Sequence, residues 1–166
     1  MARLSVTFVC TGNICRSPIG EIILRDQLAA AGLGDSIDVT SAGTGDWHIG
    51  QPADRRAQET LRMHGHDPEG HRARQFGPED FAQADLVVAL DRSHERTLRA
   101  LARTAADRDK IRLLLSFDAD AAAAGKNDVA DPYFGSIDDF EATYDVVTTA
   151  NLGLVHYLRE LLTQRP

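Results

Sequence analysis

The chain has 166 residues, of which 43% are hydrophobic and 26% charged, with two cysteines and a formal net charge of −7. The acidic balance, without any basic stripe, excludes general nucleic-acid binding, and no apolar run approaches the roughly 20 residues that span a bilayer, so we expect no membrane association. The length suits one domain covering residues 1–166, and the few cysteines and the absence of a signal peptide predict a cytoplasmic location, with export by a route that needs no signal left open.

Apolar periodicity and turn residues divide the chain into alternating strands and helices. In chain order we expect a strand at 4–10, a helix at 17–32, a strand at 36–44, a helix at 54–66, a short helix at 78–84, a strand at 85–91, a helix at 92–103, a strand at 111–117 and a helix at 136–164. Ser17 is expected to cap the first of these helices, with Pro18 in its first turn and Gly32 at its end.

Two segments are open at this stage. Residues 118–135 are interpreted as a long loop, in which a short alanine helix at 119–124 is an alternative. Gly153 either interrupts or kinks the last helix, or is carried within it.

The alternation predicts an α/β fold, specifically a three-layer α/β/α sandwich around a four-stranded parallel twisted sheet. In such sheets ligands bind beyond the carboxyl ends of the strands. The loops after the strands at 4–10, 36–44 and 111–117 are therefore the candidate binding segments.

The first of these loops lies in "VCTGNICRSP", residues 9–18, and spaces Cys10 and Arg16 as C-x5-R. Gly12 and Asn13 readily adopt unusual backbone angles, so the loop can aim several N–H groups at one point, to which the following helix adds its positive end. Arg16 can grip two phosphate oxygens. A Cys10 thiolate stabilised there would be a nucleophile. The predicted phosphate-binding loop comprises Thr11, Gly12, Asn13, Ile14, Cys15 and Ser17, between or beside Cys10 and Arg16.

This stretch resembles the C-x-G-N-x-C-R-S-P signature of the low-molecular-weight protein tyrosine phosphatases, of the bacterial type. The segments "SAGT" after the second strand, "GHRARQ" at 70–75, "DFAQADLVVALD" at 80–91 and "DPYFG" at 131–135 follow in the same order as in that family. The resemblance covers essentially the whole chain.

The resemblance implies hydrolysis of phosphotyrosine and small aryl phosphates through a phosphocysteine on Cys10, with no metal and no cofactor. Arg16 would bind phosphate and stabilise the transition state. Asp131 would be the general acid and then the general base, and Pro132 independently biases Asp131 away from helix.

Supporting roles also follow from the resemblance. Ser17 would hydrogen-bond the Cys10 sulfur, and Asn13 would hold the loop with Ser41 and His71 as partners. The walls of the substrate cleft would be aromatic and come from Trp47, Tyr133 and Phe134.

The resemblance further implies that Cys15 forms a protective disulfide with Cys10 under oxidation, although a merely packed Cys15 thiol is an open alternative. Expected partners are phosphotyrosine proteins, and phosphate, vanadate or similar oxyanions in the site. We expect a monomer, or at most a weakly self-associating chain.

Other interpretations are less favoured. An arsenate reductase of the related fold needs further cysteines, and none follows Cys15. A phosphotyrosine-binding module without activity would lack Cys10 or Asp131, and Trp47 could be an ordinary core residue. His94 stands where many family members carry Asn, so it receives no role, nor do His48, His64, His66 and His156.

Overall fold

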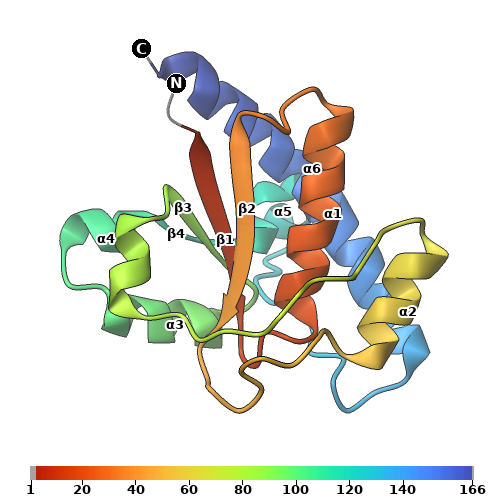
Figure 1. Cartoon of the computed structure of the whole chain (residues 1–166). Coiled ribbons are helices and arrows are strands. Elements are labelled where there is room, and N and C mark those ends of the chain that lie inside the picture. Colours follow the sequence, from red (N-terminus) through yellow and green to blue (C-terminus); the bar gives the residue numbers. More distant parts are fainter. Residues whose placement is uncertain (1–2, 166) are drawn as a thin grey trace.

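Four parallel strands form one sheet in the order β2-β1-β3-β4: β1 (Leu4–Cys10), β2 (Ile37–Gly43), β3 (Leu86–Ala89) and β4 (Ile111–Leu113). Figure 1 shows this arrangement in a computed structural model that describes residues 3–165. The helical elements are α1 (Arg16–Ala30), α2 (Arg55–Met63), η1 (Pro78–Ala82), α3 (Arg92–Leu101), α4 (Ala105–Asp109), η2 (Leu114–Phe117), α5 (Ala119–Ala123) and α6 (Ile137–Gln164).

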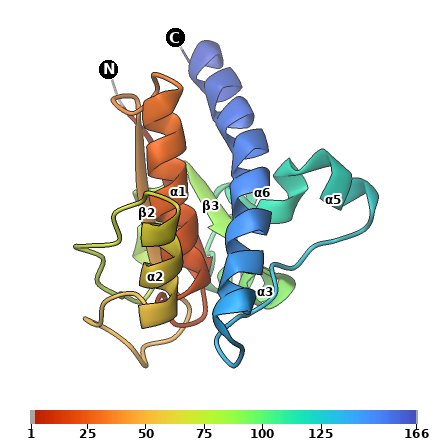
Figure 2. The ribbon, with the colours of Figure 1, turned by 90° about the vertical axis from the view of Figure 1, so that its right-hand side faces the viewer.

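Helices cover both faces of the sheet, because successive strand side chains point to opposite sides. Val6 and Phe8 of β1 are fully buried in the core shared with α1, α2 and α6. Val9 and Val87 lie in a second core with residues of η1 and α3. Figure 2 shows α1, α2 and α6 together in front of the strands. The three-layer α/β/α sandwich predicted from the alternation of elements is confirmed.

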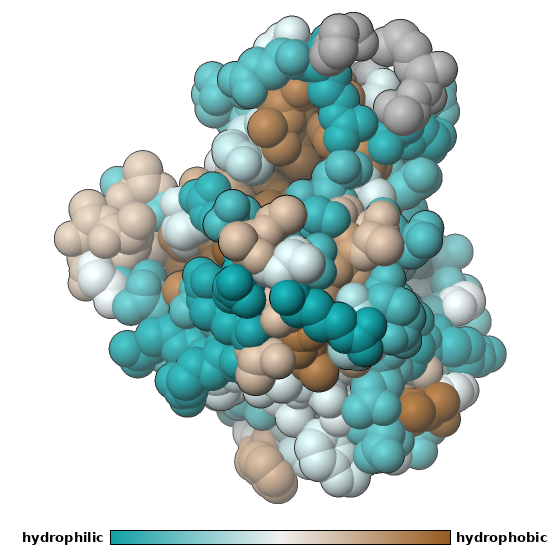
Figure 3. Space-filling view, turned by 90° about the vertical axis from the view of Figure 1, so that its left-hand side faces the viewer, coloured by the Kyte–Doolittle hydropathy of each residue, from teal (hydrophilic) through white to brown (hydrophobic). Residues whose placement is uncertain are grey.

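The carboxyl ends of the strands converge on one end of the molecule, at the bottom of Figure 1. The loop after β1, the loop between β2 and α2, and the segment that leads into α6 all lie there, as parallel connectivity requires. On the face that carries α3 and α4, Figure 3 shows mainly hydrophilic residues, with apolar ones in small patches. Within residues 3–165, no helix is long and apolar enough to cross a membrane.

The structure departs from the prediction most clearly at the last strand and at one additional helix. The strand expected at 111–117 ends at Leu113, and Leu114–Phe117 form the 3-10 turn η2. Ser116 Oγ donates to the Leu113 carbonyl at 2.7 Å, which stabilises that turn. A short apolar run does not distinguish a strand from a buried helical turn. The helix α4 was not expected from the sequence; the Thr104 side chain caps its first turn.

The two open segments are resolved by the structure. The short alanine helix exists as α5, and the Asp118 carboxylate caps it by accepting from the Asp120 and Ala121 amides. Helix α6 runs through Gly153 without interruption. A Cβ on Gly153 would lie 1.8 Å from the Phe117 carbonyl oxygen, so the glycine permits η2 to approach the helix.

Candidate active site

The phosphate-binding loop, Cys10–Arg16, turns its carbonyl groups outward. Four of these oxygens accept hydrogen bonds from neighbouring segments: Cys10 O from Thr44 N (2.8 Å), Thr11 O from Gly45 N (2.9 Å), Asn13 O from His71 Nε2 (2.7 Å) and Ile14 O from Asp54 N (2.8 Å). Within residues 3–165, the N–H groups of residues 12–16 donate to no protein oxygen. Such a ring of free N–H groups at a helix N-terminus is suited to bind a tetrahedral anion.

Asn13 holds the loop in this conformation. Its φ of 57° lies in the left-handed region, which Asn tolerates better than most residues. Its amide nitrogen donates to Ser17 Oγ (2.8 Å) and Ser41 Oγ (2.9 Å), while its Oδ1 accepts from the Arg74 amide at 3.0 Å. The Asn13 side chain is fully buried, so its contacts are protected from water.

Ser17 contacts the candidate nucleophile. Its hydroxyl accepts from Asn13 and lies 2.9 Å from the Cys10 sulfur and 3.3 Å from the Ala42 carbonyl, so its one proton can be donated to a Cys10 thiolate at the shorter of these two contacts. The prediction that Ser17 caps α1 is wrong, because the helix begins at Arg16 with Cys15 in the cap position and without a side-chain cap. Ser17 is thereby free to face the sulfur.

The buried acid Glu21 of α1 anchors the hydrogen bonds of Asn13 and Ser17 through Ser41. Ser41 Oγ donates to Glu21 Oε1 at 2.6 Å, and Glu21 also pairs with Arg25. Hydrogen bonds therefore run from Glu21 through Ser41, Asn13 and Ser17 to the Cys10 sulfur. Because every link is buried or partly buried, the chain orients the Ser17 hydroxyl.

Arg16 is 3% exposed and is held by an acid outside the loop. Its Nη1 donates to Asp91 Oδ2 (2.7 Å) and to the Val129 carbonyl (2.8 Å). Burial by itself would raise the pKa of Asp91, but hydrogen bonds from Ser93 and Arg16 lower it to about 2. Asp91 therefore stays ionised and fixes the guanidinium, with Nη2 left toward the cleft.

His94 belongs to the same cluster, contrary to the expectation that it has no role. It is 2% exposed, its Nδ1 accepts from the Asp91 amide at 3.2 Å, and its Nε2 lies 2.8 Å from Thr11 Oγ1. Burial and then the Arg16 charge lower the His94 pKa to about 4. The neutral ring hydrogen-bonds to Thr11 Oγ1 through Nε2 and supports the start of the loop.

Asp131 faces the loop from the segment before α6. Its Oδ2 lies 3.6 Å from Arg16 Nη2, and its Oδ1 accepts from the Tyr133 amide at 3.1 Å. The side chain is 47% exposed, so it lies at the mouth of the site and not in the core. A carboxyl group there can exchange a proton with a leaving group bound above the loop.

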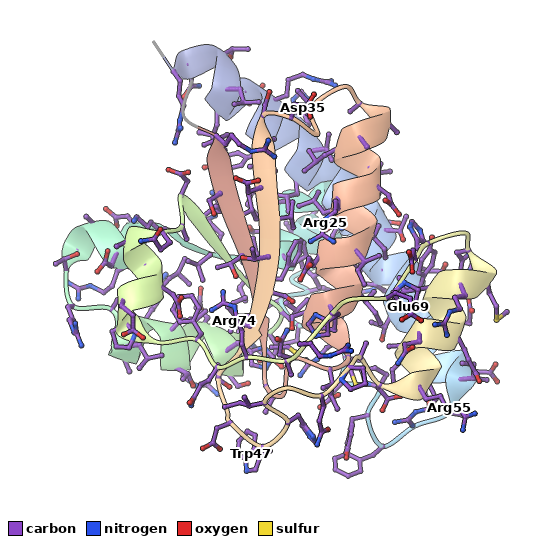
Figure 4. The ribbon with its side chains drawn as sticks, viewed as in Figure 1. Arg25, Asp35, Trp47, Arg55, Glu69 and Arg74 are labelled. Carbon is purple, nitrogen blue, oxygen red and sulfur yellow. The ribbon has the colours of Figure 1, made fainter. Side chains whose placement is uncertain are left out.

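A cleft of about 280 Å³ opens over the loop. It is lined by Cys10, Thr11, Gly12, Ile14, Cys15, Arg16, Trp47, His48, Asp131, Tyr133 and Phe134. Trp47 is 68% exposed, so it is not a core residue, and Figure 4 shows it in the loop that follows β2, at the same end as the other site segments. Phe134 is 93% exposed, and its ring meets that of Tyr133 edge to face at 4.9 Å. Flat walls of this kind fit an aromatic ring.

His48 is a further lining residue that received no role from the sequence. A Cβ on Gly12 would lie 2.8 Å from the His48 ring. The glycine thus allows this ring to approach the loop, and the His48 ring centroid is 6.3 Å from that of Tyr133.

Cys15 is buried and carries a free thiol, as does Cys10. Burial raises the pKa of the Cys15 thiol most, and the negative charges of Asp54 and Cys10 raise it further. Cys15 is therefore held as a neutral thiol beside the candidate nucleophile, and does not compete with it as a thiolate.

No cluster of three or more His, Cys, Asp or Glu side chains suited to a metal occurs within residues 3–165. The candidate chemistry of this site is carried by the loop amides, one thiol, one guanidinium and one carboxyl group.

Comparison with known proteins agrees with this geometry. Residues 5–164 match the model of the family "Low molecular weight phosphotyrosine protein phosphatase". The chain belongs to this family. It is 51% identical over 161 residues to "Low molecular weight protein-tyrosine phosphatase A" of Mycobacterium tuberculosis, covering 97% of this chain and 95% of that one. It is 49% identical to the low molecular weight protein-tyrosine-phosphatase of Streptomyces coelicolor, with 96% of each chain covered.

A solved structure of a protein tyrosine phosphatase has the same fold. The protein tyrosine phosphatase from Entamoeba histolytica, with Hepes in its active site, superposes with a TM-score of 0.88 at 28% identity, covering 95% of this chain and 97% of that one. Membership of the phosphatase family, the recognition made from the loop motif, is thus confirmed.

The predicted site residues fall into two groups in the structure. Most line the cleft directly, whereas four lie beneath the loop as its support: Asn13, Ser17, Ser41 and His71. Sequence reasoning missed Asp91, His94, Glu21 and His48. An acid at the carboxyl end of a predicted strand was the one available signal for Asp91.

Proposed function

We propose that the chain hydrolyses phosphotyrosine in proteins, and small aryl phosphates, through a phosphocysteine intermediate. The observation that carries the proposal is the arrangement of one thiol and one carboxyl group on the same cleft. Cys10 lies at the base of a loop whose N–H groups are free, and Asp131 lies at its mouth, 3.6 Å from Arg16.

In the first step the Cys10 sulfur attacks phosphorus and the bond to the phenolic oxygen breaks. Asp131 gives its proton to that oxygen, so that the leaving group departs as a neutral phenol. The loop amides and Arg16 bind the three equatorial oxygens, where charge is concentrated in the transition state.

In the second step water attacks the phosphocysteine. Asp131, now ionised, accepts the proton of that water, and the sulfur leaves as a thiolate that Ser17 can hydrogen-bond. Phosphate is released and the enzyme returns to its starting state.

Preference for phosphotyrosine follows from the walls of the cleft. Trp47, Tyr133 and Phe134 place flat aromatic surfaces above a thiol that lies at the bottom. A phenyl ring can be held between them with its phosphate on the loop, whereas a phosphoserine side chain is too short to use them. Phosphate, vanadate and other tetrahedral anions should occupy the loop, and the Hepes in the Entamoeba structure carries such a group.

The proposed enzyme is one catalytic domain over residues 1–166. One chain supplies every proposed site residue, so the mechanism requires no second subunit. The free thiols of Cys10 and Cys15 fit a reducing compartment such as the cytoplasm. An arsenate reductase is not supported, because no cysteine outside the loop can carry a disulfide outward.

The test is turnover of p-nitrophenyl phosphate in EDTA by the wild type and by Cys10→Ser. We expect full wild-type activity in the chelator, competitive inhibition by vanadate, and no turnover by the variant. Activity of Cys10→Ser at the wild-type level would overturn the mechanism, and loss of wild-type activity in EDTA would show that a metal takes part.

A further inference from the structure

The segment 54–56 lies between the two halves of the site. The Asp54 amide donates to the Ile14 carbonyl at 2.8 Å, which ties this segment to the phosphate-binding loop. The Asp54 carboxylate accepts from the Arg56 amide at 2.8 Å and so caps α2. Residue 54 is thus fixed relative to Cys10 by backbone contacts.

Arg56 extends from this anchor to the segment that carries the general acid, residues 130–135, which we call the acid loop. Its Nη1 donates to the Gly135 carbonyl (2.8 Å) and its Nη2 to the Tyr133 carbonyl (2.8 Å). Its Nε and Nη2 also donate to the two oxygens of Asp54, each at 3.0 Å. The Arg56 guanidinium also lies 4.5 Å from the centroid of the Phe140 ring. Its orientation is therefore fixed both by this ring and by its hydrogen bonds.

The acid loop has few other attachments. Within residues 3–165, Arg56 is the one residue outside the loop that hydrogen-bonds to residues 130–135. The remaining hydrogen bonds of the loop are internal, from Gly135 N to the Pro132 carbonyl and from Tyr133 N to Asp131. Pro132 is buried and Asp131 faces Arg16 at 3.6 Å, whereas Tyr133, Phe134 and Gly135 are exposed, so the hydrogen bonds from Arg56 are the main attachment of the second half of the loop.

Burial and charge favour a rigid connection. The Asp54 side chain is 13% exposed and that of Arg56 31%. Burial by itself would raise the pKa of Asp54, but the hydrogen bonds from Arg56 lower it below its usual value. Asp54 is therefore ionised at neutral pH, and its ion pair with Arg56 persists there. A bidentate pair of this kind restricts both partners.

We propose that Arg56, oriented by Asp54, is a positioning residue that sets the place of Asp131 over the phosphate-binding loop. It contacts neither thiol nor phosphate site, and acts by holding the carbonyl groups that follow the general acid. The inference rests on the proposed phosphatase function. Displacement of a catalytic group by about 1 Å can cost on the order of 10²-fold in rate.

The experiment compares Arg56→Met with Arg55→Met. Methionine keeps part of the apolar stem over Phe140 and removes all the hydrogen bonds, while both variants lose one positive charge. Arg55 is the matched control, since it projects from the same helix turn (Figure 4) and makes no hydrogen bond or ion pair within the described residues. For each protein, kcat/KM is measured on phosphotyrosine, a poor leaving group, and on p-nitrophenyl phosphate, a good one.

We expect Arg56→Met to lose roughly 10- to 100-fold in kcat/KM on phosphotyrosine and less than about 3-fold on p-nitrophenyl phosphate, because protonation matters most for poor leaving groups. Its inhibition constant for vanadate should stay within about 2-fold of the wild type, since the phosphate-binding loop is unchanged. Arg55→Met should match the wild type throughout. Equal losses on both substrates, or no loss, would overturn the inference.

A second pair of variants keeps the test decisive if Arg56→Met folds poorly. Arg56→Lys keeps the charge on a single nitrogen but loses the planar fork of donors, and Asp54→Asn keeps the helix cap while removing the ion pair. Both should show a smaller loss of the same leaving-group-dependent kind, and a uniform loss in both would refute the positioning role.

A double variant separates this inference from a general defect. Added to Asp131→Asn, Arg56→Met should cause no further loss that depends on the leaving group, because both changes act on the same proton transfer. Independent, multiplicative losses would contradict the proposal. Inactivity of the wild type on both substrates would instead refute the proposed function itself.

Discussion

Replacement of His94 by Asn should change how the stability of this protein depends on pH. His94 lies 2% exposed between Asp91 and Thr11, and its pKa in the folded state is about 4, against 6.5 for an unperturbed imidazole. Burial and the neighbouring Arg16 disfavour the protonated ring. Asn is a suitable substitute because its amide can still donate and accept, but it does not titrate.

The direction and size of the effect follow from proton linkage. Between pH 6.5 and about 4 the unfolded chain binds a proton at His94 that the folded chain does not, so stability falls as the pH falls. The stabilisation is fully present above pH 6.5 and is lost on acidification toward pH 4. The full difference corresponds to about 3 kcal/mol, of which about 2 kcal/mol develops between pH 7 and pH 4.5.

The assay is urea unfolding of the wild type and of His94→Asn at pH 7, 6, 5 and 4.5. All other titrating groups are shared, so the difference between the two curves isolates His94. The wild type should lose about 2 kcal/mol more than the variant across this range. His156→Asn is the control, because His156 is largely exposed on α6. Parallel curves for the wild type and His94→Asn would refute the account of a histidine held neutral.

Three further outcomes are expected. Asp131→Asn should lower kcat/KM by roughly 10²- to 10³-fold on phosphotyrosine and by much less on p-nitrophenyl phosphate; equal losses would remove Asp131 from the acid role. Gly153→Ala should destabilise the protein by about 1–3 kcal/mol in urea unfolding, despite the better helix propensity of Ala, because its Cβ would lie 1.8 Å from the Phe117 oxygen; a stabilised variant would contradict this contact. Peroxide should inactivate the wild type in a way that thiols reverse, and Cys15→Ser irreversibly; equal recovery by both would exclude a protective disulfide with Cys10.

Much of the site could be predicted because its central residues are contiguous in the chain. A loop that binds an anion through its own amides needs Gly12 and Asn13 within it, a helix directly after it, and a thiol and an arginine at its ends. All these requirements fall within one short stretch of the chain, so the sequence "VCTGNICRSP" is enough to predict the loop. Periodicity likewise predicted the strands and helices of the three layers.

Local patterns failed where a long-range contact competed with them. The run "LLLSF" reads as a strand, but packing of η2 against α6 bends Leu114–Phe117 into a 3-10 turn. A serine before a proline suggests a helix cap, but contacts with Asn13 and the Cys10 sulfur take the Ser17 hydroxyl instead.

The chain's own residue pattern was therefore sufficient to predict the α/β layering, the phosphate-binding loop and a candidate nucleophile, because these depend on backbone angles and periodicity within short segments. The support around them required the folded molecule. His94 reaches Thr11 across 83 positions, and Arg56 reaches Gly135 across 79. A histidine on a helix and an arginine in a helical first turn are unremarkable in sequence, and gain their roles from neighbours that folding brings together.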